Sequence, residues 1–278
     1  MNEAGKRIDR QLIARQVAGT CRLELRRALF SPRSLALYFL AAAPLLLVGV
    51  WTFTPFPVEQ FQGPRQAASI FTVIFEVYLR VSIFFSALFL FVNLYRAEIL
   101  ERTLHYYLLT PVRREVVACG KYLAALVASA GVFSLGTMAL FLLVASPWGV
   151  AELGNYLFSG PGLANLAGYV GVAALACAGY GALFMLVGVL FRNPVVPAVA
   201  IFGWEAANLA LPPLLKRFSI IHHLHALYPA PPEQSVLEVV LNRAPAWLAI
   251  SGALALTVLV LFIVGRAVRR MDLAYGGE

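Results

Sequence analysis

Residues 96–121 read RAEILERTLHYYLLTPVRREVVACGK and form the only long polar segment that lies between two strongly apolar ones. Leu100, Leu104 and Leu108 recur every four residues with charged side chains between them, which predicts an amphipathic helix of about three turns. Pro111 should end this helix, because proline disfavours the helical conformation in the preceding residue and suits the first position of a new helix. The segment therefore predicts a helix that lies along a surface, followed by a second helix that continues into apolar sequence.

Around this segment the chain has the composition of a polytopic membrane protein. Of its 278 residues 60% are hydrophobic and only 13% are charged, which excludes an ordinary soluble domain. At about 1.5 Å per residue, six apolar segments can reach across roughly 30 Å of hydrocarbon, the fifth only marginally. We therefore predict an all-α fold with six transmembrane helices, at residues 35–53, 67–95, 116–146, 163–191, 195–211 and 246–264.

The lysines and arginines predict the orientation of these spans. An even number of spans returns both termini to the same side, and most of the basic residues fall on that side if residues 96–121 lie there too. The other side receives only Arg65, Lys216, Arg217 and Arg243. The positive-inside rule therefore predicts that both termini and the polar segment are cytoplasmic, and that the net charge of +8 reflects topology rather than a nucleic-acid partner.

Three further parts of the chain complete the predicted organisation. Residues 1–34 form a basic amphipathic helix suited to an anionic headgroup region, and residues 35–268 form one membrane domain. Between spans five and six, residues 212–245 contain apolar runs too short to cross, which we interpret as short re-entrant helices on the external side. Residues 269–278 are a short cytoplasmic tail.

The polar segment also resembles a known family. Its pattern is similar to the loop after the second membrane helix of ABC-2 type permeases, the membrane subunits of certain ATP-driven transporters, and Arg102 departs from that pattern where glycine is common. The residues that carry the resemblance are Glu98, Glu101, Thr103, Leu104, Leu108, Leu109, Thr110, Pro111, Val112, Arg113, Gly120 and Lys121.

The resemblance implies a function. In that family the loop is a coupling helix, here about residues 97–110, which docks on the ATP-binding subunit. It implies that Glu98, Glu101, Thr103, Leu104, Leu108, Thr110, Pro111 and Arg113 transmit motion to the spans. It further implies two copies of the ATPase subunit, a second identical or related permease subunit, ATP and magnesium on the partner chain, a bacterial plasma (inner) membrane, and export. The few polar residues in the expected spans favour a lipidic or amphipathic substrate.

Charged residues within the expected spans are candidates for a functional site, because charge is costly in hydrocarbon. Glu76 and Arg80 lie four residues apart in the second span, where they can form an ion pair or line a substrate path. Glu205 and Asn208 lie near the outer end of the fifth span. Glu205 has no evident partner on its own helix; it can face Arg80 across helices, a polar cavity or the outer headgroups.

Other chemistry has little support in the sequence. There is no GxxxxGK phosphate-binding loop and no HExxH, so we expect a non-catalytic chain that binds no cofactor itself. His222, His223 and His225 are weak candidates for a metal site, because no other ligand type lies near them. Cys21, Cys119 and Cys177 have no metal or CxxC spacing and are expected to be unpaired thiols.

Two other functions stay open at this point. One is a non-transporting scaffold or assembly subunit of a larger membrane complex. The other is a self-sufficient secondary carrier, although the sequence shows neither inverted halves nor discontinuous spans.

Labelling of single cysteines tests the predicted orientation. In a cysteine-free background, a cysteine at Glu115 should react with an impermeant thiol reagent only from the cytoplasmic side, and a cysteine at Ser235 only from the outside. The reverse pattern in intact cells and inverted vesicles would contradict the orientation given by the basic residues.

Overall fold

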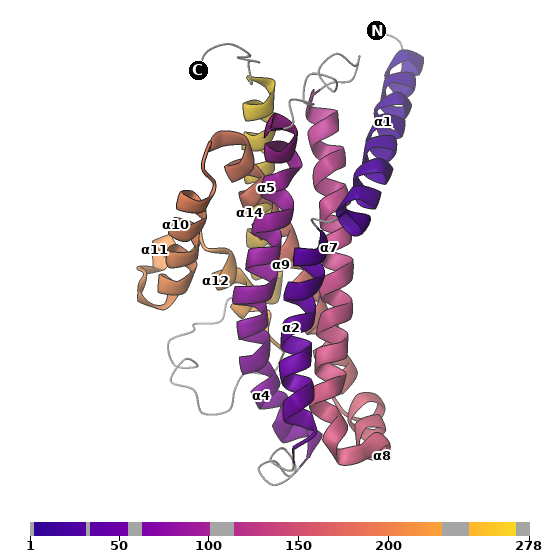
Figure 1. Cartoon of the computed structure of the whole chain (residues 1–278), viewed down its shortest axis with the longest axis vertical. Coiled ribbons are helices and arrows are strands. Elements are labelled where there is room, and N and C mark those ends of the chain that lie inside the picture. The colour runs from indigo at the N-terminus through magenta and orange to yellow at the C-terminus, as the bar shows by residue number, and fades with distance from the viewer. Residues whose placement is uncertain (1–2, 32–33, 55–62, 101–113, 230–244, 271–278) are drawn as a thin grey trace.

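The computed structural model describes residues 3–31, 34–54, 63–100, 114–229 and 245–270, which form helices joined by short turns, with no strand among them (Figure 1). The longer helices are α1 (Glu3–Phe30), α2 (Ser34–Thr52), α4 (Pro64–Val77), α5 (Phe84–Leu100), α7 (Arg114–Ala145), α9 (Gly162–Leu190), α10 (Val195–Ala206) and α14 (Ala246–Arg269). The shorter ones are η1 (Tyr78–Ile83), η2 (Ser146–Trp148), α8 (Gly149–Gly154), η3 (Asn155–Ser159), η4 (Ala207–Ala210), α11 (Pro213–Lys216) and α12 (Ile220–His225). The predicted all-α class is confirmed for this part of the chain.

Within the described residues, five helical segments are long and apolar enough to cross a membrane, which indicates a multi-pass membrane protein. They match five of the six expected spans to within a few residues at most of their ends. Their bounds are Ser34–Thr52, Ala67–Ala97, Arg114–Ser159, Gly162–Leu190 and Ala246–Arg269.

The expected fifth span, residues 195–211, does not reach this length. Its α-helix, α10, has 12 residues, which corresponds to roughly 18 Å and is well short of the hydrocarbon thickness. The 3₁₀-helix η4 extends it by four residues, and Pro212 then begins a new direction. The expected span over residues 195–211 is therefore not confirmed, because its α-helix ends before it is long enough to cross the hydrocarbon.

The arrangement of the helix ends agrees with the predicted topology. In Figure 1 the start of α1, the end of α5, the start of α7 and the end of α14 all lie at the upper end of the molecule. Since α9 also runs towards that end, the segment that contains α10, α11 and α12 leads the chain back towards α14. In this way five long helices still leave both described ends of the chain on one side.

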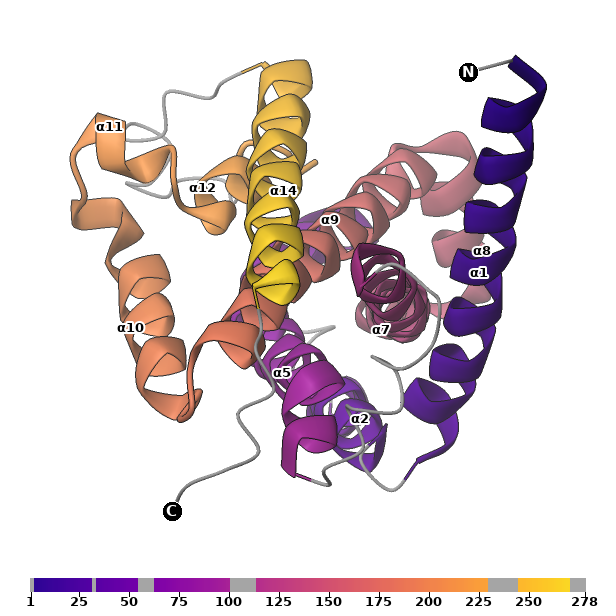
Figure 2. The same ribbon diagram turned by 90° about the horizontal axis from the view of Figure 1, so that it is seen from above.

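α1 lies obliquely along α7 rather than parallel to it (Figure 2). Glu24 and Ala28 are buried on the contact face, while the arginines at 15, 22, 26 and 27 are exposed. The structure has a helix over Glu3–Phe30 of the predicted residues 1–34, and its main contact among the described residues is α7.

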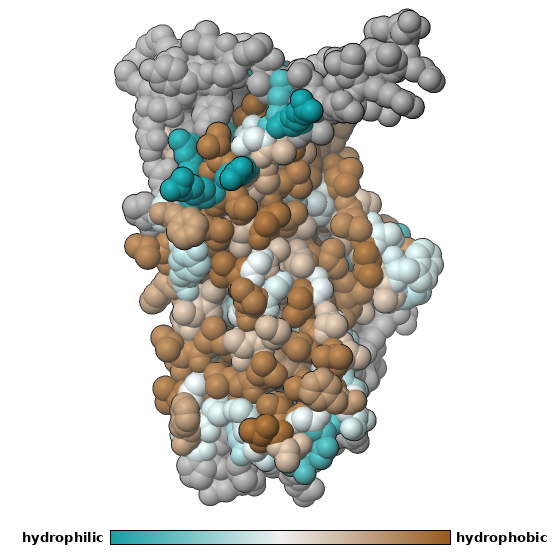
Figure 3. All heavy atoms as spheres, turned by 90° about the vertical axis from the view of Figure 1, so that its right-hand side faces the viewer, coloured by the Kyte–Doolittle hydropathy of each residue, from teal (hydrophilic) through white to brown (hydrophobic). Residues whose placement is uncertain are grey.

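The molecular surface is apolar over the middle of the bundle. Figure 3 shows a broad hydrophobic belt below a group of hydrophilic residues near the upper end. Much of this belt is aliphatic, as in α2, where Leu46, Leu47 and Val50 are each at least 70% exposed. Such side chains are expected on a surface that faces lipid.

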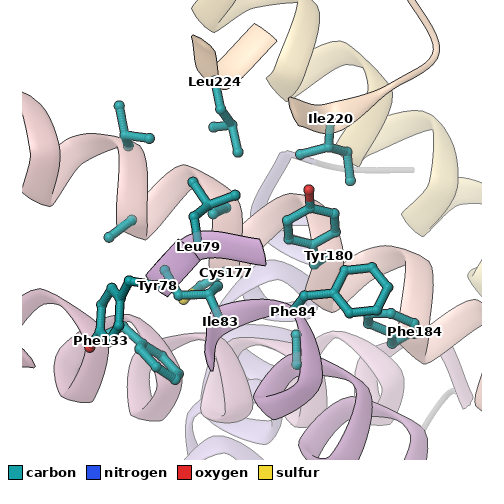
Figure 4. Packing of buried hydrophobic residues seen from close by; sticks show 14 of the residues in the cluster. Tyr78, Leu79, Ile83, Phe84, Phe133, Cys177, Tyr180, Phe184, Ile220 and Leu224 are labelled. Carbon is teal, nitrogen blue, oxygen red and sulfur yellow. The ribbon is translucent and has the colours of Figure 1, made fainter. Parts of the chain in front are cut away.

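The bundle interior is rich in aromatic side chains. Phe84 at the start of α5 packs edge-to-face on Tyr180 and Phe184 of α9, and Tyr78 packs on Phe133 of α7 (Figure 4). These contacts lie around η1, a six-residue π-helix in the middle of the second span. The π-helix is uncommon and is often found at functional sites.

The connection between α7 and α9 is helical. Residues 146–159 form η2, α8 and η3, and Gly149 at the join has a φ of 87°, which a residue with a side chain adopts only at a cost. Helical turns satisfy the backbone polar groups internally next to an apolar surface.

Two glycines of α9 offer a matched test of this packing. A Cβ at Gly188 would lie 2.7 Å from the Val92 carbonyl oxygen, whereas a Cβ at Gly171 would meet nothing within 4 Å. Gly188→Ala is expected to lower the free energy of unfolding by about 1–3 kcal/mol, because backbone cannot move aside easily. Gly171→Ala should leave it unchanged or raise it by up to about 1 kcal/mol.

Unfolding of both variants in detergent checks this expectation. Equal stabilities would contradict the close approach of α5 to α9.

Candidate functional site: a charged cluster inside the bundle

The short helix α12 lies at about mid-height of the bundle (Figure 1). A cluster of charged and polar side chains contacts both of its ends. It contains all four residues that the sequence singled out within the expected spans. These are Glu76, Arg80, Glu205 and Asn208.

Glu76 accepts hydrogen bonds from three side chains. Arg80, four residues further along the same helix, donates through Nε. His225 of α12 donates through Nε2, 2.9 Å and 2.8 Å from the two carboxylate oxygens, and the Tyr228 hydroxyl also donates. The ion pair expected between Glu76 and Arg80 is present, but it is one part of a larger set that joins the second span to the re-entrant segment.

Arg80 lies within η1 and makes a second contact across the bundle. Its Nη1 donates to the backbone carbonyl of Glu205 at 3.3 Å, so the link to α10 involves main chain and not the Glu205 carboxylate. Of the three environments that the sequence left open for Glu205, the structure shows contact with Arg80. This contact is made by the Glu205 backbone carbonyl.

The Glu205 carboxylate caps the N-terminus of α12. It accepts hydrogen bonds from the backbone N–H groups of Ile220 (3.1 Å) and Ile221 (3.0 Å), and from the hydroxyls of Ser219 (2.9 Å) and Tyr180 (3.3 Å). The first N–H groups of a helix have no partner within the helix and carry partial positive charge, so a carboxylate there is favourable. Glu205 is only 4% exposed.

Asn208 supports this cap from the adjacent 3₁₀-helix. Its Nδ2 donates to the Ser219 hydroxyl oxygen, and Ser219 in turn donates to Glu205. Both side chains are buried. The Ser219 hydroxyl thus accepts one hydrogen bond from Asn208 and donates one to Glu205.

Apolar contacts with α9 and α14 also hold α12 in position. Ile220 packs on Gly179 of α9, where an added Cβ would lie 3.1 Å from its side chain, and His223 fills the space at Gly252 of α14. Ile220, Ile221 and Leu224 are at most 2% exposed. The arrangement therefore holds α12 between α9 and α14 by close apolar packing and by charge-assisted hydrogen bonds at both ends.

The three histidines of α12 face different partners. His225 donates to Glu76, His223 Nε2 donates to the Arg217 carbonyl at 3.0 Å, and His222 packs edge-to-face on His223. Among the described residues no group of three histidine, cysteine or acidic side chains is close enough to share a metal ion.

Burial changes the acid–base behaviour of this re-entrant segment. Burial is the main cause that raises the pKa of Tyr228 well above its usual value, and the negative charge of the adjacent Glu76 carboxylate acts in the same direction. The phenol therefore stays protonated and donates. Burial also lowers the pKa of His222, and the neighbouring His223 and Lys216 act in the same direction. His222 is therefore kept neutral, and its buried Nδ1 has no hydrogen-bond partner among the described residues.

Most of the residues assigned to coupling lie outside the described residues. These are Glu101, Thr103, Leu104, Leu108, Thr110, Pro111 and Arg113, and for Glu98 only the helical backbone at the end of α5 is described. The last two residues of the family pattern, Gly120 and Lys121, lie in α7 against α1. A Cβ at Gly120 would lie 2.8 Å from Thr20 Cβ, and Lys121 Nζ is 3.3 Å from Glu24 Oε1 and 3.2 Å from the Leu94 carbonyl oxygen.

The sequence did not predict several of these contacts. Lys121, only 1% exposed, was part of the family pattern, but its buried partner Glu24 was not anticipated. The available signal was that Glu24 is the only acidic residue between Gln11 and Phe30. His225 and Tyr228 gave no comparable signal towards Glu76.

In comparisons with known proteins, no family model and no curated protein matches the chain.

Removal of the central carboxylate tests the cluster. Glu76→Gln is expected to lower the free energy of unfolding by up to about 3 kcal/mol, because Arg80 and His225 then lose a charged acceptor that is partly buried. Arg80→Gln should cost less, since His225 and Tyr228 still donate to Glu76. Reversible unfolding in mixed detergent micelles measures both values.

A charge exchange distinguishes the cluster from an isolated pair. Glu76→Arg combined with Arg80→Glu should fail to recover the lost stability, because a guanidinium would then face His225 and Tyr228. If the free energy of unfolding of the double variant instead returned to near that of the wild-type chain, Glu76 and Arg80 would act as a simple pair.

Proposed function

We propose that this chain is the membrane-spanning permease subunit of an ATP-driven transporter of the ABC-2 type. It would reside in a bacterial plasma membrane with both termini cytoplasmic, pair with a second identical or related subunit, and be driven by two separate ATP-binding subunits. Export of a lipidic or amphipathic substrate fits a bundle whose interior is mainly aromatic and aliphatic.

The observation that carries the proposal is the continuity of α7. This helix starts at Arg114, directly after the segment that resembles a coupling helix, and runs without a break to Ala145. Its 32 residues correspond to roughly 48 Å, more than the hydrocarbon thickness. A force applied to residues 101–113 would therefore reach the far side of the bundle through one rigid element.

α7 contacts the charged cluster indirectly through η1. Tyr78 of η1 packs on Phe133, and its hydroxyl lies directly over Gly136, where an added Cβ would be 2.2 Å away. Arg80 belongs to the same π-helix. A displacement of α7 would thus press on the element that holds Arg80 and, through Glu76, on α12.

α1 would move together with α7. Gly120 permits their close approach, and the buried Lys121–Glu24 pair joins them in apolar surroundings, where separation of the two charges is costly. We interpret α1 and the first half of α7 as one body beside the predicted docking site of the ATPase.

A charge on the predicted docking face tests the proposal. Leu104→Asp should reduce co-purification of a soluble ATP-binding subunit at least tenfold, because a carboxylate in a docked apolar contact loses water without gaining a partner. The matched control is Val150→Asp in α8, which places the same charge on a residue 87% exposed at the other end of the molecule. The control should leave association and ATPase activity unchanged.

The joint after the docking helix tests transmission separately. Pro111→Gly should leave the complex assembled and able to hydrolyse ATP, and should lower transport, because glycine allows the joint many more conformations than proline. Wild-type association and transport in Leu104→Asp would contradict the permease function, and co-purification with redox or assembly subunits would favour a scaffold.

A further inference from the structure

A cleft of about 490 Å³ lies between α7, α9 and α14, away from the charged cluster. Its walls are apolar for most of their area and include Ala118 and Tyr122 of α7, Met185 of α9, and Leu261, Phe262 and Gly265 of α14. All three helices are among the segments long and apolar enough to cross a membrane. The cleft is therefore a feature of the membrane domain.

The cleft opens towards the lipid-facing side of α14. Val258 and Phe262, which line it, are 64% and 59% exposed, and the same helix exposes further large apolar side chains along its length. Water in an apolar cleft within the hydrocarbon region would lack hydrogen-bond partners, whereas hydrocarbon would fill it without penalty. The physical environment thus selects an apolar occupant for most of the cleft.

One end of the cleft is charged. Glu115 and Arg269 line it there and form an ion pair, and the Arg269 carbonyl accepts a hydrogen bond from Arg114 at 3.3 Å. Arg266 also lines the cleft and lies over the Phe262 ring, 5.3 Å from its centre. Within the described part of the chain Arg266 has no ion pair, so this end has an excess of positive charge.

The position of these charges fits a lipid headgroup. Arg266 and Arg269 lie in the last turn of α14, at the end of the bundle that holds both described chain ends. A guanidinium presents several donors in one plane and binds phosphate oxygens well. Basic pockets between membrane helices at this level are suited to anionic headgroups.

We propose that this cleft binds one anionic phospholipid from the leaflet on the side of the chain ends, with an acyl chain between α7 and α14 and its phosphate at Arg266. The volume lies within the roughly 300–1,000 Å³ of small-molecule sites and is too small for a helix of a partner protein. The site is independent of any role in ATP-driven transport.

Native mass spectrometry of the full chain in detergent tests this site with phosphatidylglycerol and phosphatidylcholine that have identical acyl chains. The chain should retain one equivalent of phosphatidylglycerol in preference to phosphatidylcholine. Arg266→Gln should weaken phosphatidylglycerol binding about five- to tenfold, in line with the contribution of one basic side chain near a headgroup. Arg192→Gln, an exposed arginine after α9 and outside the cleft, is the matched control and should bind normally.

Filling the cleft from the protein side provides a second test. A Cβ at Gly265 would meet nothing within 4 Å, so Gly265→Leu starts its side chain in open space at the cleft wall, and leucine favours a helix more than glycine does. This variant should fold and lose the bound phospholipid. Gly131→Leu, at an equally open position in α7 outside the cleft, should retain it.

Cys119 provides an independent readout because it lines the cleft and is exposed. Phosphatidylglycerol should slow its alkylation, measured by peptide mass spectrometry, whereas inorganic phosphate alone should not. Equal retention of both phospholipids, or unchanged binding in both Arg266→Gln and Gly265→Leu, would overturn the proposal. Loss of a dimer in Gly265→Leu with lipid binding intact would instead identify the cleft as a contact between two copies of the chain.

Discussion

The Glu76 carboxylate imposes the strictest constraint on this structure, because a charge inside an apolar bundle must be satisfied by donors from the protein. Arg80 supplies one donor from the same helix, and the others come from His225 and Tyr228, far along the chain. To bring them there, the chain between α9 and α14 must fold into the bundle rather than cross beside it. The short α10 and the buried position of α12 follow from this requirement.

A second buried charge pair performs a similar task for α1. Packing of apolar side chains against one another gains little over packing against lipid, so it does not by itself determine where a helix docks in a membrane. Hydrogen bonds, ion pairs and close approach of helices at glycines define the docking position of a helix more precisely. Two helices that do not cross the bundle, α1 and α12, are each positioned by both: Lys121 with Gly120 for α1, and Glu205 with Gly179 for α12.

The sequence predicted those features that depend on composition along the chain. The bounds of five long helices follow from runs of apolar residues, because a helix in lipid must satisfy its backbone internally. Residues 195–211 are also mainly apolar, and composition could not reveal that α10 ends at Ala206. The charged residues of the cluster could be recognised because a charge in hydrocarbon is energetically costly. The contact of Glu76 with His225 could not be recognised, because the two residues lie 149 positions apart in the chain.

The π-helix η1 changes the rotational phase of the second span. Successive residues of an α-helix turn by about 100°, so a segment with a wider turn displaces every later residue around the helix axis. The span can therefore direct α4 towards α7 and most of α5 towards α9, two surfaces that one straight helix would not present with the same sequence. In related chains that lack the wide turn, an alignment through this helix would require a gap of one residue within Tyr78–Ile83.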